Sequence, residues 1–115
     1  MNRYPVEIRV KDQGRTLYLA FETMDISLAS EYLRVESPSA EVQGHSRDQK
    51  ILVSGKSNIR IKNVELVGNY AVRLVFDDGH SSGIYTWDYL WSLKEDEETF
   101  WKKYLSEIEK AGLSR

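Results

Sequence analysis

The chain has 115 residues, no cysteine and a formal net charge of −2, with 41% hydrophobic and 30% charged residues. This length and balance are typical of one globular domain with its own core, and they exclude a disordered chain. Without cysteine, the chain cannot form a disulfide, a thiolate nucleophile, or a cysteine-ligated zinc or iron–sulfur site.

Acidic and basic residues are interspersed along the chain, so no basic patch predicts binding to nucleic acid. No apolar run is long enough to cross a membrane, and residues 1–7 lack the apolar stretch of a secretory signal. We therefore expect a cytoplasmic protein with neither a nucleic-acid nor a membrane partner.

The N-terminal part of the chain predicts a β-hairpin followed by a short helix. Apolar and polar residues alternate over residues 6–10 and again over 17–21, and the turn residues 12–14 lie between them. Three apolar residues at helical spacing predict a helix near 28–35, with Ser27 as its N-cap. A serine-proline segment then prevents the helix from continuing.

The centre of the chain predicts an antiparallel meander. A change of parity across Lys62-Asn63 indicates a β-bulge, while Gly68-Asn69 and Asp78-Gly79 are suited to turns between strands. A brief strand is expected before the meander and three strands within it. These strands are expected at residues 50–54, 58–67, 70–76 and 84–87.

The C-terminal part predicts an amphipathic helix, because apolar residues recur at steps of three and four from 100 to 111. Ser92 and Glu95 fit a capping box, Gly112 ends the helix, and a shorter helical turn at 88–93 precedes it. The whole pattern predicts a single α+β domain over residues 1–115, with a mostly antiparallel sheet.

Several motifs follow one another in a specific order. They are Leu33-Arg34, Ser37-Pro38-Ser39-Ala40-Glu41, Gly44-His45, Tyr70-Ala71-Val72, Phe76-Asp77-Asp78-Gly79-His80, Gly83-Ile84-Tyr85 and Trp87-Asp88-Tyr89-Leu90. With them the chain closely resembles the small bacterial domain related to the N-terminal part of gamma-butyrobetaine hydroxylase, from Val6 to Arg115.

This resemblance implies an accessory domain. In the hydroxylases the module precedes a separate catalytic domain that holds ferrous iron and 2-oxoglutarate, and a similar module is appended to some Mrp-type iron–sulfur carrier ATPases. Neither activity is expected here, because the chain has no Gly-x-x-x-x-Gly-Lys-Ser/Thr phosphate loop and its two histidines do not form a two-His-one-carboxylate triad.

The hydroxylase module resembles a zinc module with three cysteines and a histidine. Laid onto this chain, the cysteine positions fall on Ser37, Ser39 and Val42, and the histidine falls on His80. Serine hydroxyls are poor zinc ligands and valine is none, so the resemblance does not carry the zinc site over.

A different metal site is an alternative that the residues leave open. His45, His80, Glu41 and Asp77 or Asp78 supply imidazole and carboxylate ligands, which suit iron, manganese or zinc if the two Gly-His segments meet. The simpler reading is that His80 bonds locally in a turn and that His45 is solvated. No cofactor is required by the sequence.

Two enzyme-like patterns also have simpler structural readings. Ser37 or Ser39 near Glu41 could form a nucleophile and base, yet no Gly-x-Ser-x-Gly elbow surrounds either serine. We expect these hydroxyls to bond backbone groups at the proline bend, Glu41 to pair with Arg34, and Asp77-Asp78-Gly79 to form a turn rather than a pair of catalytic carboxylates.

The leading hypothesis is a noncatalytic binding module that docks onto another protein or pairs with itself. Its interaction surface is expected around residues 34–45 and 77–87. Tyr85 and Trp87 share one face of a strand, where they either belong to the core or contact a partner. The residues assigned to the surface are Arg34, Ser37, Ser39, Tyr85 and Trp87.

Overall fold

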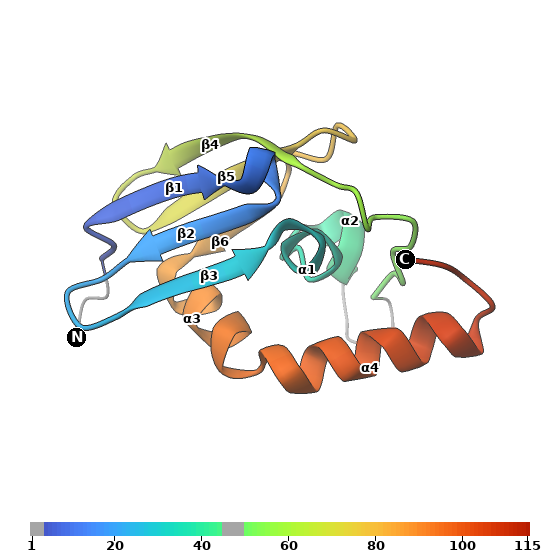
Figure 1. Cartoon of the computed structure of the whole chain (residues 1–115). Coiled ribbons are helices and arrows are strands. Elements are labelled where there is room, and N and C mark those ends of the chain that lie inside the picture. The colour runs from blue at the N-terminus through green and yellow to red at the C-terminus, as the bar shows by residue number, and fades with distance from the viewer. Residues whose placement is uncertain (1–3, 45–49) are drawn as a thin grey trace.

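The computed structural model describes residues 4–44 and 50–115 and has an α+β fold, as predicted (Figure 1). Within these residues, two three-stranded antiparallel sheets are combined with four α-helices and one 3-10 turn. In chain order the elements are β1 (Glu7–Lys11), η1 (Asp12–Gly14), β2 (Thr16–Ala20), β3 (Asp25–Ala29), α1 (Ser30–Val35), α2 (Ala40–Gln43), β4 (Ile61–Val67), β5 (Ala71–Phe76), β6 (Ile84–Thr86), α3 (Trp87–Glu95) and α4 (Glu97–Lys110).

The first sheet contains the predicted hairpin and one strand that was not predicted. Its order is β1-β2-β3, with Leu19 paired to Ile26 in the added strand. Residues 25–29 alternate between exposed and buried side chains, which is the period of a strand. The helix therefore begins at Ser30 rather than at 28, and Ser27 lies in β3 instead of capping the helix.

The second sheet confirms the predicted meander. Its order is β4-β5-β6, and the register shifts between Ile61 and Asn63, where a bulge was expected. The strand predicted at 50–54 is wrong, because this segment joins neither sheet. Its backbone bonds to α2 through Ile51 N–H and the Val42 carbonyl at 2.7 Å, and its apolar residues pack toward α4 instead.

The C-terminal region is helical as predicted, but its caps differ. Thr86 caps α3, because its hydroxyl accepts a hydrogen bond from Tyr89 N–H at 3.1 Å. Ser92 lies inside α3 and donates to the Tyr89 carbonyl, so the predicted capping box is wrong. Asp96 separates α3 from the long α4 seen along the bottom of Figure 1. No helix in the described part of the chain is long and apolar enough to cross a bilayer.

One apolar core joins both sheets to α1 and α3. In a smaller cluster, Val35 of α1 packs with Tyr104 and Ile108 of α4. The sheets approach each other closely at Gly14, where a Cβ atom would lie 2.8 Å from the Ile61 carbonyl oxygen. Glycine is required there both by this contact and by its φ of +91°. The last turn of α1 lies against the β5–β6 turn, where Arg34 contacts Asp78.

Candidate functional site

The bend after α1 meets the β5–β6 turn, so the serine-proline and Gly-His segments lie in contact. Ser37 is fully buried, and its Oγ lies 2.8 Å from Nε2 of His80. Gly83 allows this approach, because a Cβ atom there would lie 2.6 Å from Ser37 Oγ. Two segments more than 40 residues apart therefore form one cluster. We call Ser37, Glu41 and His80 the His80 cluster.

Both ring nitrogens of His80 face oxygen atoms. Nδ1 lies 3.3 Å from Oε2 of Glu41, and a carboxylate can only accept a hydrogen bond. Neutral His80 therefore carries its proton on Nδ1, and Nε2 accepts a hydrogen bond from the Ser37 hydroxyl. Ser37 Oγ also accepts from Ser39 N–H at 3.3 Å, so this hydroxyl both donates and accepts.

The surroundings of His80 favour its neutral form. Burial lowers the pKa of its imidazole, and the positive charge of Arg34 lowers it further. The carboxylates of Glu41 and Asp78 act in the opposite direction but do not cancel this effect. A buried neutral imidazole with two hydrogen-bond partners is a well-satisfied structural group.

Asp78 ties three chain segments together. Its Oδ2 accepts from Arg34 Nε at 2.9 Å and lies 2.7 Å from Lys56 Nζ, and its Oδ1 accepts from His80 N–H at 3.0 Å. Burial by itself would raise the pKa of Asp78, but these three hydrogen bonds lower it to about 2. Glu41 was expected to pair with Arg34; instead Arg34 pairs with Asp78, and Glu41 lies beside His80.

The His80 cluster has the order serine, imidazole, carboxylate that is found in serine hydrolases. Ser37 is nevertheless fully buried, and it lines neither of the two grooves that the described residues form below. Ser39 has the expected backbone role, because its Oγ accepts from Glu41 N–H at the start of α2. Ser39 Oγ also lies 2.7 Å from that of Ser82.

Metal binding stays a prediction. Within residues 4–44 and 50–115, no group of three or more His, Cys, Asp or Glu side chains is arranged to hold a metal ion. His45 lies outside the described residues. A metal on His80 would displace either Ser37 or Glu41, and Val42, at one cysteine position of the hydroxylase module, is a buried apolar residue.

The side chains predicted to form an interaction surface lie mostly inside the protein. Ser37, Ser39 and Tyr85 are buried, and Arg34 is largely buried in its contact with Asp78. Tyr85 belongs to the core, where its hydroxyl donates to the Leu33 carbonyl at 2.6 Å. Trp87 is also a core residue, although it lines a surface groove as well.

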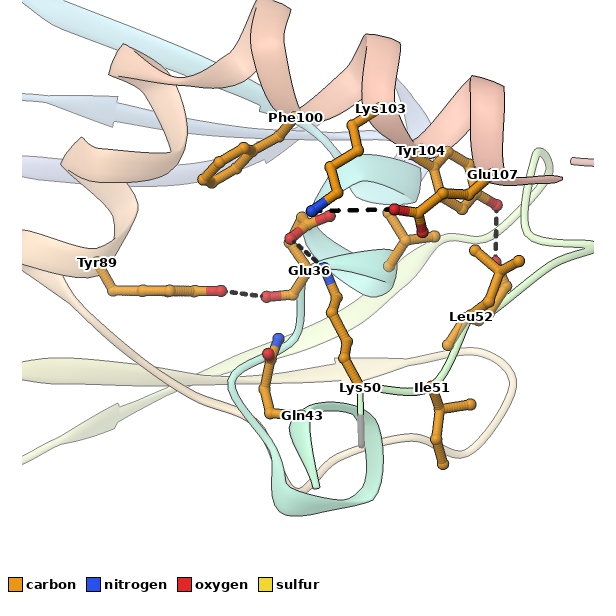
Figure 2. Close-up of a pocket in the computed structure, with 12 residues that line it drawn as sticks. Glu36, Gln43, Lys50, Ile51, Leu52, Tyr89, Phe100, Lys103, Tyr104 and Glu107 are labelled. Carbon is orange, nitrogen blue, oxygen red and sulfur yellow. Dashed lines mark hydrogen bonds and ion pairs between the residues drawn. The ribbon is translucent and has the colours of Figure 1, made fainter. Parts of the chain in front are cut away.

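Val35, Glu36 and Gln43 contribute to one wall of a groove of about 700 Å³, which we call the α4 groove (Figure 2). The α1–α2 segment and residues 50–53 face α4 across this space. Ile51 stands at the rim with 55% of its surface exposed. The groove is lined by Val35, Glu36, Gln43, Lys50, Ile51, Leu52, Val53, Tyr89, Phe100, Lys103, Tyr104 and Glu107.

Charged and aromatic groups share the α4 groove. The side chain of Glu36 is only 10% exposed, and its Oε1 lies 2.7 Å from Lys50 Nζ. Tyr89 donates a hydrogen bond to the Glu36 carbonyl, and Lys103 Nζ lies 3.9 Å from Glu107 Oε1 on α4 (Figure 2). The groove therefore combines a buried carboxylate with apolar and aromatic walls.

Sequence reasoning did not identify the α4 groove. Phe100, Lys103 and Glu107 follow helical spacing, so their shared face could have been found from the sequence. The opposite wall could not, because residues 50–53 were assigned to a strand and α2 was not predicted. The pairing of the two walls depends on tertiary contacts.

A second, more apolar groove of about 520 Å³ lies between β1 and β4. Val6 and Leu66 line it, and each has 69% of its surface exposed. Trp87 closes its inner side, where its ring N–H donates to the Asn69 carbonyl at 2.9 Å. We call it the β1–β4 groove.

Residues 8–91 match the family model described as gamma-butyrobetaine hydroxylase-like, N-terminal. One similar NMR solution structure has a TM-score of 0.84 and 45% sequence identity, over 98% of this chain and 90% of that chain. A second NMR solution structure has a TM-score of 0.83 and 40% identity, over 99% of this chain and 86% of that chain. A crystal structure of a protein of unknown function from Acidithiobacillus ferrooxidans, assigned to the DUF971 family, has a TM-score of 0.64 and 38% identity over 78% of this chain and 91% of that one. No curated protein matches the chain.

Proposed function

Because the chain belongs to the gamma-butyrobetaine hydroxylase-like N-terminal family, we propose that it is a noncatalytic accessory module that binds another protein through the α4 groove. The observation that carries this proposal is the groove itself. It adjoins the segment that contains the family-like motifs, and it exposes apolar side chains between charged ones.

The composition of the α4 groove supports contact with a protein. Interfaces combine an apolar centre with a polar rim, and their most important residues are often aromatic. Leu52 and Phe100 supply apolar surface, while Lys103 and Glu107 supply charges at the edge. The hydrogen-bonded clusters at His80 and Asp78 would then act as the rigid support behind this surface, since a fixed surface loses less entropy when it binds.

The test compares two variants that each place a charge on an exposed apolar site. Ile51→Asp alters the α4 groove, and Leu66→Asp alters the β1–β4 groove as the matched control. Tagged full-length chains are used to capture partners, and each captured protein is purified and titrated calorimetrically against the wild type and both variants. Sedimentation velocity over a concentration series measures self-association of the same three proteins.

The proposal expects one partner that binds the wild type and Leu66→Asp equally well. The same partner should bind Ile51→Asp at least tenfold more weakly, because the variant places an unpaired charge against the partner's surface. Circular dichroism must show that both variants remain folded. Equal binding to all three chains, or loss only in Leu66→Asp, overturns the assignment to this groove. Self-association lost in Ile51→Asp would identify a second copy as the partner, whereas neither partner nor self-association would overturn the binding role.

A further inference from the structure

We infer that the α4 groove recognises a basic side chain, lysine or arginine, of its partner protein, and that Lys50 occupies this cation position in the free protein. This inference rests on the proposed function and adds the chemistry of the partner. It is carried by the Glu36 carboxylate, by the aromatic residues around it and by the exposure of Lys50.

Glu36 is a fixed negative charge in the groove. Its side chain is nine-tenths buried, while its carboxylate lies within ion-pair distance of a lysine whose own side chain is 38% exposed. The charge of Glu36 also contributes, after burial, to raising the pKa of the Tyr89 hydroxyl. A buried carboxylate requires a cation, because an unpaired charge away from water is costly.

The walls around Glu36 suit an organic cation with an apolar stem. Tyr89, Phe100 and Tyr104 line the same space and supply apolar ring surface beside the carboxylate. Tyr104 is held in place because its hydroxyl donates to the Val53 carbonyl at 2.8 Å. The aliphatic parts of lysine and arginine can lie along apolar walls while the charged head reaches a carboxylate.

Lys50 and Lys103 can both leave the groove at little cost. Lys50 reaches Glu36 from an exposed loop position, and Lys103 has 75% of its side chain exposed and only a 3.9 Å contact with Glu107. The carboxylate of Glu36 cannot move out in the same way, because its side chain is buried. A partner cation would therefore replace Lys50 and leave the protein's own charge in place.

The experiment uses the purified full-length chain and two probes. One probe is n-butylammonium chloride, and the other is the blocked pentapeptide acetyl-Ala-Ala-Lys-Ala-Ala-amide. Binding is followed by amide chemical shifts in the wild type, Lys50→Ala, Glu36→Gln and Lys102→Ala. Lys102 is the matched control, because it is an exposed lysine paired with Glu98 on α4.

The inference expects the peptide to shift amides that line the groove. It should bind Lys50→Ala roughly two- to fivefold more tightly than wild type, the ratio expected when a partly exposed lysine stops competing for Glu36. Lys102→Ala should behave like wild type, and Glu36→Gln should lose binding. An absence of shifts in Lys50→Ala, or equal binding to Glu36→Gln, overturns the cation site. Butylammonium reproduces the stem and charge of a lysine side chain, so it should shift the same groove amides, and shifts confined to other amides would overturn the cation site.

These outcomes are separate from those of the proposed function. If a partner requires Ile51 but binds Glu36→Gln as tightly as the wild type, the proposed binding role stands and only the cation site is rejected. Conversely, if the probes bind but no protein partner is found, the cation site is supported and the proposed binding of a protein is rejected.

Discussion

The contact between Glu31 and Arg115 gives the sharpest prediction about stability. Glu31 lies in α1 with only 7% of its side chain exposed, and Arg115 reaches it from the end of the chain. The guanidinium donates through Nε to Oε2 at 3.1 Å and through Nη2 to Oε1 at 2.7 Å. It also lies 5.4 Å from the centre of the Trp101 ring. Arg115→Ala therefore leaves a buried carboxylate without its cation.

The magnitude follows from the burial of the two groups. Removing one partner of a fully buried ion pair costs about 3–5 kcal/mol, but the Arg115 side chain is half exposed and water can reach the vacated space. We therefore expect Arg115→Ala to lower the free energy of unfolding by about 1–2 kcal/mol. For a domain of this size, that corresponds to a fall in melting temperature of roughly 4–8 °C.

Urea and thermal unfolding followed by circular dichroism measure this change. The control is Arg9→Ala, which removes an arginine from an exposed contact with Glu7 and should have no measurable effect. The double variant Glu31→Gln/Arg115→Ala should be more stable than Arg115→Ala alone, because it no longer buries an unpaired charge. The reasoning is refuted if Arg115→Ala behaves like Arg9→Ala, or if Glu31→Gln recovers no stability.

Three further predictions concern the cluster behind the α4 groove. Burial lowers the pKa of His80 in the folded state, so its contribution to stability is full above the unfolded pKa of about 6.5 and is lost as pH falls below that value. The free energy of unfolding, measured from pH 8 to 5, should therefore depend less steeply on pH in His80→Gln than in the wild type. An equally steep dependence would contradict a lowered pKa of His80. Because the pKa of Asp78 falls to about 2, its contribution is present above about pH 4 and is lost toward pH 2, and Asp78→Asn should flatten acid unfolding in that range. Gly83→Ala should destabilise the fold by about 1–3 kcal/mol, since its Cβ would meet Ser37 Oγ; adding Ser37→Ala should recover part of this loss, and strictly additive effects would show that the clash lies elsewhere.

Much of the fold could be predicted because its strands have strong local patterns. The β4–β5 pair alternates clearly, and the bulge near Lys62 was visible as a change of parity. The strand β3 was missed because Leu28 fits a helical pattern and a strand pattern equally well over a few residues. Pairing with β2 decides between them, and this is a tertiary effect.

The candidate site was predictable as a meeting of two segments but not in its details. Glycine and proline marked the bends, and the resemblance placed Ser37 and His80 at two ligand positions of the hydroxylase zinc module. Which carboxylate joins which cation could not be predicted, because Glu41 and Asp78 are equally suitable partners until the fold fixes their distances from Arg34. The α4 groove required knowledge of how an irregular segment packs on a helix.

The convergence of three segments on Asp78 has a consequence for local opening of the native state. Arg34 lies in the last turn of α1, Lys56 lies in the loop before β4, and the His80 N–H belongs to the β5–β6 turn. Asp78 lies in this same turn, so neither α1 nor the loop can separate from the turn without removing a cation from the Asp78 carboxylate. We therefore expect their slowly exchanging amides to share one opening free energy, as a single cooperative unit would.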